Sequence, residues 1–491
     1  MRVHLLVFGV GLALGACEPP PEIEGDQAGE CDDGVDNDQD GFTDCVDRGC
    51  FASIPCDTPG DETDSGIDTA DTANRGKPSD RDGDGTPDEQ DCHPEDRSVT
   101  CRLTSLSAGF AHTCAVWDGR VRCWGANDEG QLGLGHTLPI GDDELPATAS
   151  DVDVGGAAVQ VSAGYKHTCA LLANGKVRCW GDGSKGQLGL GSHDSIGDDE
   201  TPATVGTVDL GARALSVGAG RQHTCALIEG GFVRCWGLAD VGQTGRGDTM
   251  ETGGDSLPSA ASPLALGGAV AELAVGLVHN CVRFTDGTVN CWGRGSSGRL
   301  GRGHEDAIGD DETPATAGPL EIGQRVLQLS ADGSQTCAVL ENHTLRCWGS
   351  GQYGRIGYGN TDDIGDDELP SAAGNAAGLS DAVAVEMGGY MGMALRLDGS
   401  VRTWGRGTDG RLGYASEDDV GDDEVPDGTV QIGGRARLIT AGEHHMCVAL
   451  LDAAETVRCW GLGADGRLGL GNELSVGDDE MPSAMAGVSY R

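Results

Sequence analysis

Residues 161–191 read VSAGYKHTCALLANGKVRCWGDGSKGQLGLG, and this stretch decides the fold of most of the chain. It contains two short apolar segments, an Asn174-Gly175 turn signal, a third apolar segment and a glycine-rich loop. No helical period runs through it. The stretch is therefore predicted to form three short β-strands joined by turns.

The same unit recurs along the chain, because seven tryptophans stand 56 residues apart: Trp124, Trp180, Trp236, Trp292, Trp348, Trp404 and Trp460. Repeats of three or four short strands build propeller blades, since one small twisted sheet buries both faces only against its neighbours in a ring. We predict an all-β, seven-bladed propeller over residues 102–491. An open solenoid is the alternative.

The unit resembles the regulator of chromosome condensation repeat in its Gly, His, apolar strand, Asp/Asn-Gly, Trp-Gly and Gly-Gln-Leu-Gly order. The match is fullest over residues 112–135 and 167–191. The resemblance implies a ring closed by strands from both chain ends, with residues 482–491 completing the blade that begins at Leu103. Eukaryotic members act as nucleotide exchange factors for a small GTPase, and a secreted bacterial relative inhibits β-lactamases. For this exported, acidic chain the resemblance implies a binding role and not exchange activity.

Six units carry two cysteines, 9 to 12 residues apart: Cys114 and Cys123, Cys169 and Cys179, Cys225 and Cys235, Cys281 and Cys291, Cys337 and Cys347, Cys447 and Cys459. Placing the two cysteines opposite each other leaves hairpin loops of two, three or five residues, which are permitted lengths. The sixth unit has Met393 and Thr403 instead, so the cysteines are lost together. Six hairpin disulfides are predicted. Free buried thiols are the alternative.

The N-terminus predicts export. Arg2 precedes an apolar run from Leu5 to Leu14, and Leu14-Gly15-Ala16 leads directly to Cys17. Residues 1–16 resemble a bacterial lipoprotein signal peptide, with Cys17 as the lipidated residue. We therefore expect a lipid anchor in the bacterial cell envelope, at the outer membrane. An ordinary signal peptide with Cys17 in a disulfide is the alternative.

Residues 17–101 are predicted to form an acidic stalk with two calcium loops. From residue 18 to 101 there are 26 Asp and Glu against 5 Lys and Arg, so little apolar surface can be buried. Two stretches follow an Asp-x-Asp-x-Asp-Gly order, in which alternate carboxylates converge on one cation and Gly makes the turn. The expected ligands are Asp36, Asp38, Asp40, Asp44 and Asp47, and then Asp80, Asp82, Asp84, Asp88 and Asp91. A disordered acidic tether is the alternative.

Six further cysteines lie in this stalk: Cys31, Cys45, Cys50, Cys56, Cys92 and Cys101. Their pairing stays open, because six cysteines allow 15 connectivities.

Charge and symmetry bear on function. The net charge of -46 would repel nucleic acid and attract cations or basic partners.

Six units contain Gly-Asp-Asp-Glu, and the symmetry of the ring should place these acidic loops on one rim. We expect them to cap turns, with cation binding as the alternative. Five units carry a histidine two residues before the first cysteine, which we expect to serve packing.

No unit has a catalytic set of its own, so we predict no enzyme activity. The expected function is surface-displayed binding of a protein or cell-envelope polymer. An exported propeller enzyme acting on a polysaccharide is the alternative.

Overall fold

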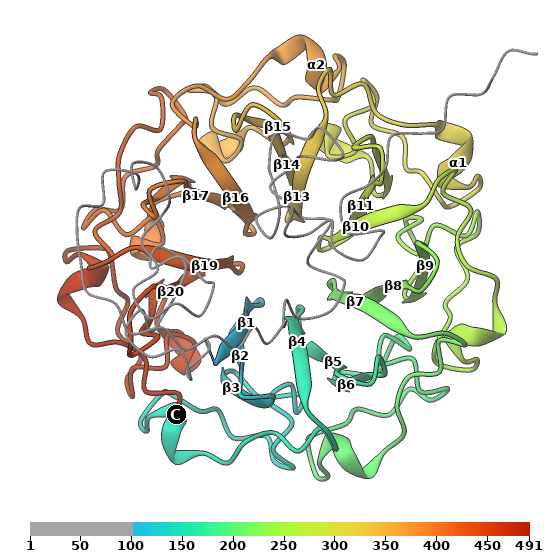
Figure 1. The fold of residues 1–491 in the computed structure, drawn as a ribbon, viewed down its shortest axis with the longest axis horizontal. Coiled ribbons are helices and arrows are strands. Elements are labelled where there is room, and N and C mark those ends of the chain that lie inside the picture. Colours follow the sequence, from blue (N-terminus) through green and yellow to red (C-terminus); the bar gives the residue numbers. More distant parts are fainter. Residues whose placement is uncertain (1–101) are drawn as a thin grey trace, which may run out of the picture. The chain divides into compact units, whose positions relative to one another are not determined.

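The computed structural model describes residues 102–491, which form seven three-stranded antiparallel sheets around one axis (Figure 1). The seven blades, in chain order, comprise β1 (Leu103–Ala108), β2 (His112–Trp117) and β3 (Arg120–Gly125); β4 (Ala158–Ala163), β5 (His167–Leu172) and β6 (Val177–Gly181); β7 (Ala214–Ala219), β8 (His223–Ile228) and β9 (Phe232–Gly237); β10 (Val270–Val275), β11 (His279–Phe284) and β12 (Val289–Gly293); β13 (Val326–Asp332), β14 (Gln335–Leu340) and β15 (Leu345–Gly349); β16 (Ala382–Met387), β17 (Met391–Arg396) and β18 (Val401–Gly405); β19 (Ala436–Ala441), β20 (His445–Leu450) and β21 (Val457–Gly461). The predicted all-β, seven-bladed propeller is confirmed.

The helical segments are single turns in the long loops that follow the third strand of each blade. They are α1 (Pro314–Ala317), α2 (Pro370–Ala373) and the 3₁₀ turns Pro146–Thr148, Pro202–Thr204, Pro258–Ala260, Ser296–Gly298, Gln352–Gly354, Thr408–Gly410, Ala464–Gly466 and Pro482–Ala484. None of the helices within residues 102–491 has the length and apolar character needed to cross a membrane.

The first strand of each blade lies nearest the axis, and the third lies outermost (Figure 1). All seven repeated tryptophans are completely buried. Each lies on a third strand and packs against a glycine of the loop from the preceding blade, as Trp180 does against Gly133. The repeat therefore supplies its own contact between neighbouring blades.

The hairpins pair the cysteines as the sequence predicted. Cys114 lies opposite Cys123 and Cys169 opposite Cys179, and all six predicted disulfides are present, with Cα atoms 4.0 to 4.1 Å apart. The Asp118-Gly119 loop has positive φ at both residues, as the tight hairpin turn requires. In the sixth blade Met393 lies opposite Thr403, at the two positions that the paired cysteines occupy in the other blades.

The repeated histidines join successive blades. Thr168 Oγ1 donates to the Gln131 carbonyl and so accepts from His112 Nε2, at 2.8 Å in both cases. The pairs His167 with Thr224, His279 with Thr336, and His445 with Thr113 repeat this arrangement. Burial lowers the pKa of His112 to about 4, which keeps the ring neutral. The packing role expected for these histidines is confirmed.

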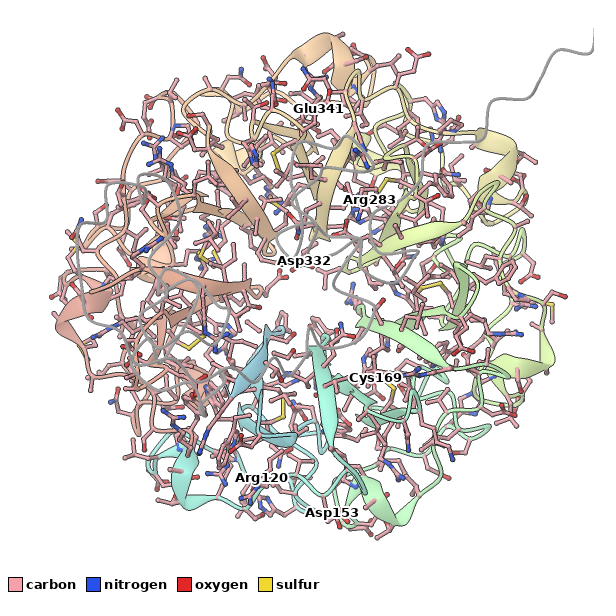
Figure 2. The ribbon with its side chains drawn as sticks, in the orientation of Figure 1. Arg120, Asp153, Cys169, Arg283, Asp332 and Glu341 are labelled. Atoms are coloured by element: carbon pink, nitrogen blue, oxygen red, sulfur yellow. A yellow bond between two sulfur atoms is a disulfide. The ribbon has the colours of Figure 1, made fainter. Side chains whose placement is uncertain are left out.

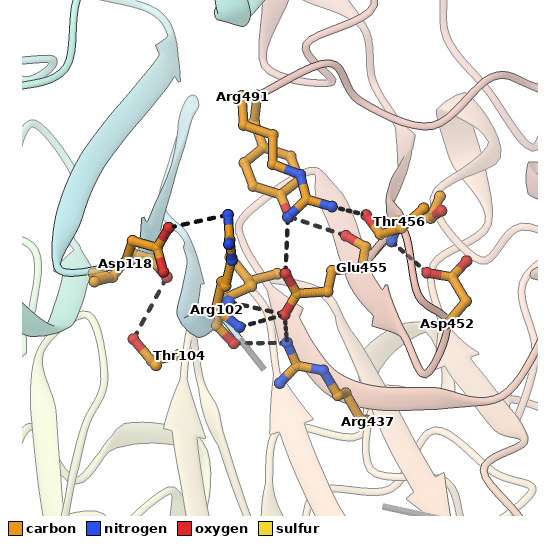
Figure 3. Close-up of polar contacts among 12 residues, drawn as sticks. Arg102, Thr104, Asp118, Arg437, Asp452, Glu455, Thr456 and Arg491 are labelled. Atoms are coloured by element: carbon orange, nitrogen blue, oxygen red, sulfur yellow. Dashed lines mark hydrogen bonds and ion pairs between the residues drawn. The ribbon is translucent and has the colours of Figure 1, made fainter. Parts of the chain in front are cut away.

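Glu455, a fully buried residue in the turn between β20 and β21, lies where the ring closes (Figure 3). Its Oε1 accepts from the backbone N–H groups of Arg102 and Leu103, at 2.7 and 3.0 Å, and pairs with Arg437. Its Oε2 pairs with Arg491 at 2.9 Å. One carboxylate thus joins the start of β1, the last blade and the chain end.

The expected closure by strands from both chain ends is wrong. The sheet that contains Leu103 is made of β1, β2 and β3 alone. The tail lies beside its own last blade, where Val488 N–H donates to Val457 O, and contacts the first blade's loop through Ala147 and Ser489. Side-chain and loop contacts close this ring without a shared sheet.

Candidate binding face

The loops between the first and second strands of the blades meet around the axis at one end of the ring. Five of them donate a backbone N–H to the neighbouring loop, as Phe110 does to Gly164 O and Tyr165 does to Gly220 O. Each loop carries two residues just before the histidine position, and these vary from blade to blade. They are Phe110 and Ala111, Tyr165 and Lys166, Arg221 and Gln222, Leu277 and Val278, Gly333 and Ser334, Gly389 and Tyr390, and Glu443 and His444.

This variation contrasts with the rest of the unit. The second of the two positions has a different residue in every blade, whereas the tryptophan and the glycine after it are present in all seven. Because the framework repeats and these tips do not, the tips can form an asymmetric site around the axis. We call them the inner rim.

Five rings form a continuous aromatic arc on this face: Tyr353, Tyr390, His444, Phe110 and Tyr165. Phe110 and Tyr165 have ring centroids 4.1 Å apart, and Tyr390 stacks on His444 at 6.2 Å. All five are partly exposed. Aromatic side chains that are half-buried and fixed by neighbours are typical anchors of protein interfaces.

Arginines lie over the arc. Arg355 is 4.8 Å from the centre of the Tyr390 ring, Arg406 is 4.9 Å from that of Tyr353, and Arg221 is 5.2 Å from that of Tyr165. These distances are within the range of cation–π contacts. The face therefore combines aromatic and guanidinium groups, although the chain as a whole is acidic.

A cavity of about 150 Å³ lies at the centre of the inner rim. Phe110 and Leu277 line it together with three acidic residues, Asp332, Glu386 and Glu443. Figure 2 shows Asp332 at the centre of the ring, far from the outer residues Arg120 and Asp153. Burial raises the pKa of Glu386 to about 8 and raises that of Asp332, which also lies near Glu443.

The Gly-Asp-Asp-Glu loops connect neighbouring blades. The glycine carbonyl accepts from a loop N–H of the preceding blade, as Gly197 O does from Gly135, at 3.0 Å. Gly253 makes the same contact although its unit reads Gly-Gly-Asp-Ser and keeps only Asp255 of the three acids, so the glycine carries this packing role. The three carboxylates of one loop lie close together, and burial with the neighbouring acids raises the pKa of Glu200 to about 7.

Many predicted site residues lie outside the described residues 102–491. These are Cys17 and both calcium loops, from Asp36 to Asp47 and from Asp80 to Asp91, together with the six stalk cysteines. Within the described part, the twelve hairpin cysteines form six disulfides. The inner rim was missed at the sequence level, although its signal is present: two variable positions inside an otherwise regular repeat.

The geometry defines a class, a seven-bladed β-propeller built from one repeated unit. Residues 118–171 and 174–227 match the profile of the Regulator of chromosome condensation (RCC1) repeat, and residues 158–187 match a second profile of that repeat. The described part of the chain is therefore a seven-bladed β-propeller that matches the RCC1 repeat between residues 118 and 227.

Curated relatives agree with this assignment. The chain is 28% identical over 380 residues to the ultraviolet-B receptor UVR8 of Arabidopsis thaliana, a match that covers 76% of this chain and 80% of the receptor. It is 29% identical over 382 residues to the E3 ubiquitin-protein ligase HERC2 of Mus musculus, covering 77% of this chain. The matched part is only 7% of that ligase.

Solved structures show the same fold. Yeast RCC1 (Prp20), solved bound to Kap60, has a TM-score of 0.59 at 19% identity, with 85% of this chain and 91% of that chain covered. Human WBSCR16 has a TM-score of 0.58 at 20% identity, with 71% and 87% covered. A further Saccharomyces cerevisiae Prp20p structure, at 22% identity, has a TM-score of 0.56 and covers 70% and 80%; its description names binding to Gsp1p and histones.

Proposed function

We propose that this protein is a lipid-anchored binding propeller that recognises a protein or a cell-envelope polymer through its inner rim. The observation that carries the proposal is a break in symmetry: the seven equivalent blades present different residues where their loops surround the axis, and there these residues include a continuous arc of aromatic rings. A single partner is asymmetric, so its site must use positions at which the blades differ. A protein is the preferred partner, because Tyr and Arg are enriched at interface hot spots and the yeast relative is described in complex with proteins.

The test uses the full-length protein as bait in an envelope extract, with crosslinking and mass spectrometry. Tyr390→Ala removes an anchor from the aromatic arc. Phe232→Ala is the matched control, because this aromatic residue is exposed next to a hairpin turn at the opposite end of its blade. We expect Tyr390→Ala to weaken capture of the partner about tenfold or more, which corresponds to about 1.4 kcal/mol. Equal capture by both variants would exclude the inner rim as the binding face.

The anchor belongs to the same proposal. A cysteine after Leu14-Gly15-Ala16 supports lipidation of Cys17, which would retain the propeller at the outer membrane. Cys17→Ser should release a soluble form. Absence of labelled palmitate from the unmutated protein would contradict the anchor.

Calcium binding by residues 17–101 is the third part of the proposed function. Five carboxylates within twelve residues repel one another unless a cation lies between them, and the order of Asp36 to Asp47 supplies alternate oxygen ligands. Calorimetry on the full chain should give calcium heat at roughly 10⁻⁴–10⁻³ M, reduced in Asp36→Ala with Asp80→Ala. Unchanged heat in that variant would leave an acidic tether.

We propose that the protein performs no chemistry. The alternative, an exported enzyme that acts on a polysaccharide, predicts release of reducing ends from envelope glycans. Such release, lost on substitution of Asp332 or Glu443, would favour the enzyme.

A further inference from the structure

The acidic residues of the central cavity are not part of the repeat. Asp332 stands where each of the other six blades has glycine. Glu386 lies opposite Met393, and the same register in the other blades holds the small residues Ser107, Ser162, Gly218, Ala274, Ser330 and Thr440. Packing of the ring therefore does not require these carboxylates, and three successive blades place them in one cavity.

Their hydrogen bonding is incomplete. Glu443 Oε2 is buried and has no hydrogen-bond partner among residues 102–491. Within the described part of the chain, Asp332 accepts a local bond from Gly333 N–H, at 2.7 Å, and Glu386 accepts from Ser330 at 3.3 Å. Burial without a paired cation is costly for a carboxylate. Arg355, Arg411 and Arg221 lower the pKa of Glu443, but burial outweighs them and the pKa stays raised.

The rest of the cavity wall is mixed, with the serines Ser107, Ser162 and Ser330 beside several apolar side chains. Phe110, Val275, Leu277 and Met387 line it beside the carboxylates. The methylene stem of a long basic side chain can pack on these apolar side chains while its charged end reaches the acids. The net charge of -46 also draws a basic partner toward the ring.

We propose that the central cavity receives the side chain of a lysine or arginine from a basic protein docked on the inner rim. This inference rests on the proposed function and adds the chemistry of the partner. The aromatic arc contacts the surface around that side chain, and Asp332, Glu386 and Glu443 pair with its ammonium or guanidinium group.

The test is calorimetric titration of the full-length protein with a capped tetralysine peptide at 150 mM salt (roughly an 8 Å Debye length). The cavity variant combines Asp332→Asn, Glu386→Gln and Glu443→Gln. The matched control combines Asp143→Asn, Asp199→Asn and Asp311→Asn, which removes the same number of carboxyl groups from exposed acidic loops. We expect at least about tenfold weaker binding by the cavity variant, under about threefold by the control, and no binding of the ε-acetylated peptide by the unmutated protein.

Equal weakening by the two variants would mean that the peptide senses net charge only, and would overturn the proposal. A second result would also overturn the proposal. If the unmutated protein binds calcium and the cavity variant does not, while the peptide binds both proteins equally, the cavity is a metal site. The single variant Glu443→Gln is titrated as well, and its melting temperature is measured. This variant shows whether weaker binding by the triple variant comes from misfolding. If the cavity variant still captures the partner that Tyr390→Ala loses, the binding face stands and only this inference fails.

Discussion

Blades one to three and blades four to seven differ at one buried position in the loop after the third strand. The first group has glutamine there (Gln131, Gln187 and Gln243), and the second group has arginine (Arg299, Arg355, Arg411 and Arg467). The backbone has the same role in both groups, since the carbonyls of Gln131 and Arg355 each accept from a tryptophan of the next blade, at 2.9 Å.

The side chains at this position reach different partners. Gln131 stays local, accepting from Glu129 N–H and donating to Asp128. Arg355 instead crosses to the next blade, where it donates to Gly389 O at 3.3 Å.

The arginines support the inner rim on one side of the ring. Arg299 and Arg467 donate to Gly333 O and Phe110 O, and Arg411 contacts His444. These loops carry, or lie next to, the aromatic arc and the acids of the cavity. The backbone therefore maintains the ring, which leaves the side chains at one buried position free to support the inner rim in one half of the ring.

The largest expected effect is at Glu455, where the two groups of blades meet. Glu455→Ala removes the carboxylate that pairs with Arg437 and Arg491 and leaves two backbone N–H groups without their acceptor, so we expect a loss of about 3–5 kcal/mol in the free energy of unfolding. Denaturant unfolding measures it. Glu341→Ala, in an exposed turn of blade five (Figure 2), is the control and should stay within about 0.5 kcal/mol. Similar losses in both variants would contradict the closing role of Glu455.

The next largest effect on the free energy of unfolding is expected for the disulfides. Here blade two, which has a bridge, is compared with blade six, which has none. Replacing Cys169 and Cys179 by alanine should cost about 2–3 kcal/mol, because the bridge restricts the unfolded chain. Conversely, Met393→Cys with Thr403→Cys should form a seventh bridge, since these residues share the cysteine register. Peptide mapping without reductant identifies the bonds. Free thiols at Cys169 and Cys179 in the unmutated protein would show that the hairpin argument is wrong.

The glutamine and arginine groups can be compared directly. Arg355→Ala removes the contact to Gly389 O, and we expect a loss of about 1.5–3 kcal/mol with faster amide exchange at residues 388–390. Gln187→Ala removes one local bond from Lys185 N–H and should cost about 1 kcal/mol. Equal rates of amide hydrogen exchange at the inner rim in the two variants would mean that the arginines and the glutamines do not differ in their support of these loops.

The last expected effect concerns the dependence of stability on pH. Glu386 receives a hydrogen bond from Ser330, faces Glu272 and Asp332, and has its pKa raised to about 8, chiefly by burial. A raised acid pKa means that its stabilising contribution is full below about pH 4.5 and is lost as pH rises through about 8. Glu386→Gln should flatten this loss. The measurement is the melting temperature of the unmutated protein and of Glu386→Gln from pH 4 to 9. The buried histidines change stability with pH in the opposite direction, but they are present in both proteins, so their effect cancels in the difference between the two curves. Parallel curves would contradict the assignment.

Much of the fold could be predicted because its signals are local and repeated. The interval of 56 residues counts the blades, and the spacing of Cys169 and Cys179 gives the hairpin register. The position of Asp332 relative to Glu386 and Glu443 could not be predicted, since these residues come from three blades and meet only when the ring closes. The family resemblance misplaced the closure, because nothing local indicates that Glu455 binds the N–H groups of residues more than 350 positions away.

The sequence by itself determined the blade number, the strand register and the disulfide pairs. Each depends on residues within one unit, where short-range pairing and turn geometry restrict the chain strongly. Only the tertiary structure decided which variable residues share a face, how the ring closes and where carboxylates are buried together. Those features depend on contacts between blades, and a repeat that is regular in sequence says nothing about which of its irregular positions converge on the axis.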